Sequence, residues 1–161
     1  MPKIQATAET AGTRVETSQC NVTALRKASR RVSQLYDAML APCGLRSTQR
    51  AILVYVGRAG SPTMTELASS LVLDRSALNH NLKPLQRDGL LTTIVDPNDR
   101  RSRLIQLTKR GEAKVRDSRI AWAKAQERFE AIFGAKQAAA LRAALDLISA
   151  QEFSEGFAQT A

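Results

Sequence analysis

Two short stretches of this sequence carry side chains whose chemistry suits contact with nucleic acid. The first opens an expected helix that begins at Asp74. An Asn there can pair with two edge atoms of adenine, a Ser with several bases and an Ala methyl with the methyl of thymine, whereas Lys neutralises phosphates. The candidate contacts in this stretch are Arg75, Ser76, Ala77, Asn79, His80 and Lys83.

The second stretch is the arginine-rich tip of an expected β-hairpin. A Pro-Asn turn signal separates two β-compatible runs, and Arg100, Arg101 and Arg103 follow it. Arginine on a narrow protruding hairpin fits the minor groove, whose negative potential is greatest where the groove narrows. We expect Asp99 to pair with one of these arginines and to fix the shape of the tip.

Enzymatic and metal chemistry find little support in the residues. The sequence has no Walker loop, no HExxH, no CxxC and no dinucleotide-binding glycine pattern. His80 is the one histidine of the chain, which excludes a site built from several histidines. A Cys43–His80 nucleophile pair is conceivable, but Cys43 follows an expected helix end and nothing orients His80. We therefore expect no enzyme, no cofactor and no bound metal.

The two cysteines, Cys20 and Cys43, are too few for a disulfide framework and indicate a reducing, cytoplasmic environment. Cys20 is the candidate for redox chemistry. Arg26 and Lys27 are nearly two helical turns away from it, and nothing adjacent clearly lowers its pKa. A structural or incidental cysteine is therefore the favoured interpretation.

Composition supports a polyanionic partner. The chain of 161 residues is 43% hydrophobic and 24% charged, with a formal net charge of +9, which favours nucleic acid over other partners. The flanks 1–19 and 135–161 are close to neutral, so the excess of positive charge lies in the residues between them. The longest apolar run, Ala51 to Val56, is too short to cross a bilayer, and the polar first nineteen residues do not resemble a secretory signal.

Hydrophobic periodicity predicts the order of the elements. An apolar stripe predicts a helix over 22–39, which ends before Pro42. Three shorter helices follow, with Ser47, Thr63 and Asp74 as expected N-caps, and then the hairpin of Leu90–Val95 and Arg103–Leu107. Thr108 is expected to cap a long helix that ends at Gly134, and one further helix carries Leu141, Leu145, Ile148 and Phe153.

The predicted fold class is mainly α with a small β-hairpin wing, that is, a winged helix-turn-helix flanked by long helices. Its parts are a mobile arm over 1–19, a dimerisation helix over 20–44, the winged domain over 45–107 and C-terminal dimerisation helices over 108–161. Pro84 conflicts with this prediction, because proline inside a helix costs about 3 kcal/mol. From sequence alone the recognition helix would end or kink near Lys83.

Over residues 20–155 the sequence resembles the MarR family of bacterial transcriptional regulators. The resemblance is strongest at 73–78, 82–90, 96–103 and 107–111, and similar family members also carry a proline within the recognition segment. Its most recognisable features are Asp-x-Arg in the wing, at Asp99 and Arg101, and Leu-Thr-x-x-Gly after the wing.

That resemblance implies a homodimer in which the first and last helices of two subunits interleave, so the operator would be a pseudo-palindrome of double-stranded DNA. It also implies a repressor that a small aromatic or phenolic effector releases. Candidate effector-binding residues are Tyr36, Met39, Arg50 and Trp122. Cys20 is similar to the cysteine of a branch that senses hydroperoxides, although its register differs. Asn79 and His80 replace residues common in similar proteins, so no operator sequence can be carried over.

Two other functions stay open. One is a nucleic-acid-binding protein without sequence specificity, either architectural or directed at RNA. No aromatic residue falls in the groove-facing segment to stack on unpaired bases, which favours duplex DNA. The other is a thiol-based redox-sensing regulator that acts through Cys20.

Overall fold

The computed structural model describes residues 20–159, so the arm predicted over 1–19 lies outside the described residues. The described residues form two units that divide between Leu35 and Tyr36. The first unit contains most of α2 (Asn21–Leu40), the helix expected over 22–39. Val22, Leu25 and Leu35 of this helix are exposed.

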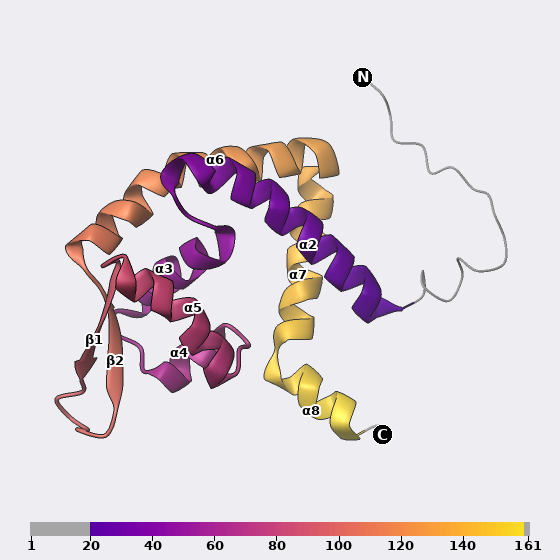
Figure 1. Cartoon of the computed structure of the whole chain (residues 1–161). Helices are drawn as coiled ribbons and strands as arrows, with labels where there is room; N and C mark the ends of the chain where they lie inside the picture. The colour runs from indigo at the N-terminus through magenta and orange to yellow at the C-terminus, as the bar shows by residue number, and fades with distance from the viewer. Residues whose placement is uncertain (1–19, 160–161) are drawn as a thin grey trace, which may run out of the picture. The chain divides into compact units, whose positions relative to one another are not determined.

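The second unit begins with the end of α2 and the 3-10 turn η1 (Ala41–Cys43) and continues into the winged domain. This domain comprises α3 (Ser47–Ala59), α4 (Met64–Ser70), α5 (Arg75–Arg87), β1 (Leu91–Val95) and β2 (Arg103–Leu107), as Figure 1 shows. Its order of three helices and then a hairpin confirms the fold class expected from sequence.

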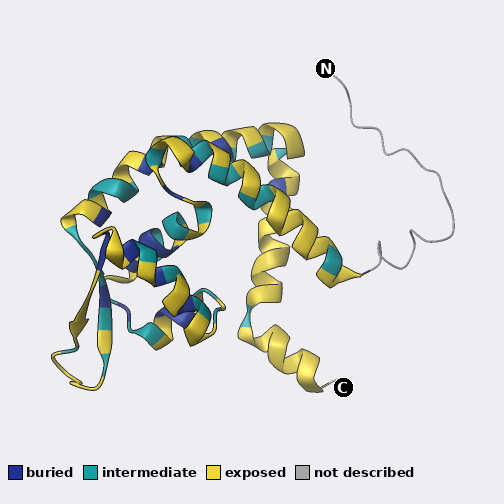
Figure 2. Cartoon of the chain, viewed as in Figure 1, coloured by how far each residue is buried: buried dark blue, intermediate teal, exposed yellow. Residues whose placement is uncertain are grey.

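A single hydrophobic core holds the winged domain together. The three helices and the base of the hairpin each contribute buried aliphatic side chains, and Figure 2 shows the winged domain's buried residues in dark blue. The fully buried members include Leu53, Val56, Leu67, Leu78, Leu85 and Ile105. Burying a leucine stabilises a fold by about 1.5–3 kcal/mol, so this cluster is the principal source of the domain's stability.

Local capping sets where these helices begin. The Thr63 hydroxyl accepts from the Glu66 amide, and the Glu66 carboxylate accepts from the Thr63 amide, so the expected N-cap Thr63 forms a capping box. The Asp74 carboxylate likewise accepts from the amide of Ala77 at 2.7 Å. Ser47 is not the N-cap that the sequence suggested. It is the first residue of α3, and its amide and hydroxyl both donate to Asp37 at 2.6 Å.

Helix α5 continues through Pro84 to Arg87, so the expectation of an end at Lys83 was wrong. The proline removes one backbone hydrogen bond, but Leu82 and Leu85 on either side of it are buried. Two buried leucines contribute about as much as the proline costs, or more. Gly89, at a φ of 67°, then turns the chain, and its amide donates to the Gln86 carbonyl oxygen.

The wing is a two-stranded antiparallel sheet in which Leu91 pairs with Leu107 and Val95 with Arg103. Strand β2 is also bridged to Thr63, the residue before α4. Strand β2 is therefore joined to the helical part of the domain almost to its outer end, and the tip beyond it extends away from the core (Figure 1).

The C-terminal part differs from expectation in one respect. Helix α6 (Lys109–Phe133) is capped by Thr108 as predicted. The single last helix is in fact two, α7 (Ala135–Ser149) and α8 (Gln151–Gln159), because Ala150 takes an extended conformation with ψ 148°. No helix among residues 20–159 is long and apolar enough to span a membrane.

Candidate nucleic-acid interface

Helix α5 has two chemically distinct faces. Leu78, Leu82 and Leu85 are buried in the core, whereas the polar candidates lie on the outer face. The exposed residues are Arg75, Ser76, Asn79, His80 and Lys83, and Ala77 is half-buried beside them. The leucine spacing therefore places every predicted polar contact of this helix on its solvent side.

Hydrogen bonds at the start of α5 order this outer face. The Arg75 guanidinium donates to the Thr65 hydroxyl of α4 at 3.0 Å, which connects the two helices of the motif. The Asn81 side-chain amide donates to the carbonyl oxygen of Ala77 at 2.9 Å, a hydrogen bond within α5. Thr65 was not predicted from sequence, since only the folded arrangement brings it beside Arg75.

The wing tip is shaped by carboxylates that bind backbone amides. Asp96 accepts from the Asn98 amide at 2.8 Å, and Asp99 accepts from the Arg101 amide at 3.0 Å. The expected ion pair of Asp99 with an arginine side chain is not among the salt bridges of the described residues. The short Asp side chain can reach the amide two residues ahead, so Asp99 stabilises the turn without neutralising an arginine.

The three wing arginines are not equivalent. The Arg103 guanidinium donates to the carbonyl oxygens of Arg100 and Ser102 at 3.0 and 3.1 Å, so it bends back onto the wing. The side chains of Arg100 and Arg101 are exposed and make no side-chain hydrogen bond or ion pair among the described residues. Arg100 and Arg101 are therefore the two cations at the tip that remain available to a polyanion.

Of the four residues expected to bind a small molecule, Arg50 and Trp122 are brought together. The Arg50 guanidinium carbon lies 4.7 Å from the centre of the Trp122 ring, and its Nε donates to the buried Ser118 hydroxyl at 3.2 Å. Burial lowers the pKa of Arg50, and the charge of Arg58 acts in the same direction. This guanidinium is stabilised by an aromatic face and a hydroxyl, and no carboxylate of residues 20–159 forms an ion pair with it.

A cleft of about 530 Å³ between α3 and α6 opens beside this pair. Its charged and aromatic lining residues are Arg50, Arg58, Arg116, Arg119, Glu112 and Trp122. Arg58, Arg116 and Arg119 were not predicted from sequence, although their spacing from Arg50 and Glu112 is helical. Four guanidinium groups against one carboxylate make the cleft electropositive and suited to an organic anion.

Tyr36 and Met39, the other two candidates, do not line this cleft. Tyr36 donates a hydrogen bond to Gln126 and packs edge-on against Phe129, and burial raises the pKa of its phenol. The Met39 sulfur accepts from the Arg128 guanidinium at 3.4 Å. Both side chains join the end of α2 to the second half of α6.

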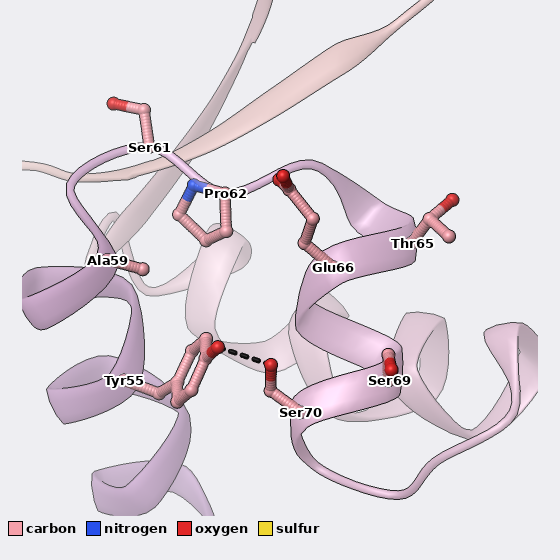
Figure 3. A pocket seen from close by; sticks show the side chains of 8 residues that line it. All are labelled: Tyr55, Ala59, Ser61, Pro62, Thr65, Glu66, Ser69 and Ser70. Carbon is pink, nitrogen blue, oxygen red and sulfur yellow. Dashed lines mark hydrogen bonds between the residues drawn. The ribbon is translucent and has the colours of Figure 1, made fainter. Parts of the chain in front are cut away.

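A second hollow, of about 590 Å³, lies between α3 and α4 (Figure 3). Its lining is mostly small and polar, and the Tyr55 hydroxyl donates to Ser70 across it. Its one charged residue, Glu66, is engaged in the capping box with Thr63. The one carboxylate of this hollow is therefore already used in helix capping.

Both cysteines are free thiols. Cys20 is exposed directly before α2. The expectation that nothing adjacent lowers its pKa was wrong, because hydrogen bonds from the Thr23 side chain and amide lower the pKa of its thiol. Cys43 is half-buried, and its carbonyl oxygen accepts from Lys114 at 3.0 Å. No group of three or more metal-ligating side chains occurs among the described residues.

Comparison with known proteins shows which family the winged domain resembles. Residues 44–102, which contain α3 to the wing tip, match the family model described as the MarR family. This match is to less than half of the chain, and over that segment the sequence is similar to the MarR family. The multiple antibiotic resistance protein MarR of Salmonella typhimurium is 34% identical over 80 residues, which are 50% of this chain and 56% of that protein. The transcriptional activatory protein BadR of Rhodopseudomonas palustris is 35% identical over 71 residues, covering 42% of this chain and 41% of BadR.

The match to these curated MarR-family relatives thus spans about half of their length. Solved structures are similar over more of the chain. The transcriptional repressor CouR, solved with a 23-mer DNA duplex, is 26% identical at a TM-score of 0.77, over 88% of this chain and all of that one. The regulator MosR of Mycobacterium tuberculosis, also solved with DNA, is 29% identical at a TM-score of 0.75, over 86% of this chain and 98% of MosR. These MarR-family relatives are regulators, not enzymes.

Proposed function

We propose that this protein is a sequence-specific, double-stranded DNA-binding regulator of transcription of the MarR family. The proposal rests on one observation, the exposed polar face of α5 beside a wing whose tip leaves Arg100 and Arg101 available. In this arrangement α5 enters the major groove and the wing reaches the adjacent minor groove. Arg75, Ser76, Ala77, Asn79, His80 and Lys83 are the proposed contacts from α5.

The wing contributes Arg100 and Arg101 as contacts, with Asp99 and Arg103 shaping the tip. CouR and MosR, which share the fold, were both solved with DNA, and this supports the assignment. BadR is named an activatory protein and CouR a repressor, so the direction of regulation differs among the relatives. Repression is proposed here from the resemblance and from CouR, which is similar over more of the chain.

A homodimer is the second part of the proposal. Within the second unit, α7 and α8 expose Leu141, Leu145, Ile148 and Phe153, and the first unit exposes Val22, Leu25 and Leu35 of α2. Exposed apolar surface on this scale is typical of a contact between subunits. Two copies would present two recognition helices to half-sites about one helical turn apart.

The decisive experiment is binding of the full chain to DNA from upstream of its own gene, against a scrambled duplex, over a salt series. Fluorescence anisotropy should give a large preference for the upstream duplex, with two protomers per site and a steep salt dependence. Arg101→Ala should weaken binding without dissociating the dimer. Equal affinity for both duplexes would favour an architectural protein, and a preference for RNA would favour an RNA-binding one.

We propose, in addition, that a small aromatic anion regulates DNA binding from the Arg50–Trp122 cleft. The support is the electropositive lining and the open face of the cleft, since a carboxylate would pair with Arg50 and a ring would pack on Trp122. Tyr36 and Met39 contact the second half of α6, outside the cleft, so they would affect effector binding only indirectly. CouR has also been solved with p-coumaroyl-CoA, at 21% identity and a TM-score of 0.70 to this chain.

Trp122 is the single tryptophan of the chain, so its fluorescence reports on this cleft. Titration with 4-hydroxybenzoate should change that fluorescence and lower DNA affinity, whereas neutral 4-hydroxybenzyl alcohol should do neither. Arg50→Ala should abolish the response, and Arg110→Ala, an exposed arginine of α6 outside the cleft, should not. A response that survives in Arg50→Ala contradicts this assignment of the site.

The redox alternative has a simple test in Cys20. Its lowered thiol pKa is the one observation in its favour, and no second thiol among the described residues is bonded to it. We expect Cys20→Ser to bind DNA as the wild type does, with and without hydroperoxide. Loss of DNA binding on oxidation in the wild type alone would favour the redox function.

A further inference from the structure

The two strands of the wing are attached to the domain in different ways. Strand β2 is held by backbone contacts, because the Ile105 amide donates to the Pro62 carbonyl oxygen at 2.9 Å and Leu104 bridges Thr63. Gln106 adds a side-chain hydrogen bond to Ser61 at 2.8 Å. Beyond its first residue, Leu91, every residue of β1 is exposed.

One side-chain hydrogen bond joins this outer strand to the recognition helix. The Gln86 Nε2 of α5 donates to the Thr93 Oγ1 of β1 at 2.9 Å. Among the described residues it is the only side-chain hydrogen bond between α5 and β1. Gln86 lies in the last turn of α5, after the proposed base contacts, and Thr93 lies at the middle of its strand.

The length of the wing makes this contact consequential. A strand rises about 3.3 Å per residue, so Arg101, three residues before Leu104, lies up to roughly 10 Å beyond the last residue of β2 that contacts the rest of the domain. A tilt of about six degrees at Leu104 therefore moves the tip by about 1 Å, and a displacement of that size is enough to weaken a preorganised contact. A restraint at Thr93, halfway along β1, limits such a tilt.

We propose that Gln86 and Thr93 are positioning residues that fix the angle between the wing and the recognition helix. Through them Arg101 enters the minor groove in register with the α5 contacts in the major groove, and neither residue itself contacts a base. This inference rests on the proposed DNA-binding function and specifies how its two contact elements are coordinated.

The test is a double-mutant cycle on a duplex that the wild-type protein selects from a random library. Gln86→Ala should weaken binding about two- to tenfold, the range expected for one hydrogen bond. In an Arg101→Ala background the same change should leave affinity unchanged within about twofold, because the contact that it positions is gone. Base preference should relax at the flanking positions under the wing and stay intact at the positions under α5.

Variants of the strand give the matched controls. Thr93→Val removes the acceptor hydroxyl and should reproduce Gln86→Ala, whereas Thr93→Ser keeps the hydroxyl and should bind as the wild type does. Thr92→Val, at the neighbouring exposed threonine, should have no effect. Amide hydrogen exchange without DNA should quicken in 91–95 for Gln86→Ala and Thr93→Val, and it should be unchanged in α5 and for Thr92→Val.

The outcomes distinguish failure of the positioning role from failure of the proposed function. If Gln86→Ala and Arg101→Ala add in free energy, or if Gln86→Ala alone has no effect, the positioning role is wrong. Equal loss of preference at all positions indicates general destabilisation and also overturns it. A wild-type protein that selects no sequence overturns the proposed function, and this inference with it.

Discussion

A Cβ atom at Gly111, in the first turn of α6, would lie 2.1 Å from the carbonyl oxygen of Leu90. The helix therefore contacts the backbone at the base of the wing directly. The Thr108 hydroxyl donates to the Gly89 carbonyl oxygen at 2.7 Å, and the Thr108 amide donates to that of Leu90 at 3.1 Å. The Leu-Thr-x-x-Gly sequence thus joins α6 to the turn that ends the recognition helix.

This contact predicts the effect of Gly111→Ala. The added methyl group would overlap backbone atoms that cannot move away without displacing the wing or α6, so we expect a loss of stability of roughly 2 kcal/mol or more. Chemical denaturation with a constant m-value measures it. Gly156→Ala is the control, because a Cβ there meets nothing within 4 Å and the change should be neutral or slightly stabilising. Equal effects at both positions would contradict the close contact.

Replacing Val72 with glycine should stabilise the protein. It is a β-branched residue at a φ of 50° in the turn before α5, and its side chain is 69% exposed. Left-handed backbone costs an L-residue about 1–2 kcal/mol, which glycine avoids, although glycine loses more entropy on folding. We expect Val72→Gly to raise the free energy of unfolding by about 0.5–1 kcal/mol. Val72→Ala keeps the Cβ and should gain little, so an equal gain from both variants would argue against backbone strain.

Loss of the Asp74 cap should reduce both the stability of α5 and the affinity for DNA. Its carboxylate is the only side-chain cap that α5 has, and Ala in its place should cost about 1 kcal/mol of stability. The same variant should bind DNA more weakly, because the first turn of α5 would fray. Asp74→Asn keeps the acceptor oxygen and should restore stability in thermal unfolding. If Asn behaves like Ala, the cap hydrogen bond is not the cause.

Glu66 predicts a dependence of stability on pH. Hydrogen bonds from the Thr63 amide and hydroxyl lower the pKa of this carboxyl group below its ordinary value. A group whose pKa is lower in the folded state stabilises the fold above its unfolded pKa, about 4.3, and this contribution is lost as the pH falls through the folded value. The advantage of the wild type over Glu66→Gln should therefore be present at pH 7 and shrink toward pH 3. A difference that is constant over this range would contradict the assignment.

Much of the fold could be predicted because its signals are local. The leucines of α5 repeat at helical spacing, and Thr63, Asp74 and Thr108 cap helices with hydrogen bonds that span only a few residues. Such patterns depend on backbone geometry near one position, so the sequence shows them directly. The polar face of α5 could be predicted from the sequence for the same reason.

Other features were decided by tertiary structure. Pro84 stays helical because buried leucines offset its cost, and α7 separates from α8 at Ala150, where neither Gly nor Pro marks a break. Arg50 meets Trp122, Gln86 meets Thr93, and Gly111 meets Leu90 only when distant segments pack together. The sequence by itself determined which faces were apolar and where α4, α5 and α6 began. Which side chains met across those faces depended on packing between elements, and no local pattern encodes it.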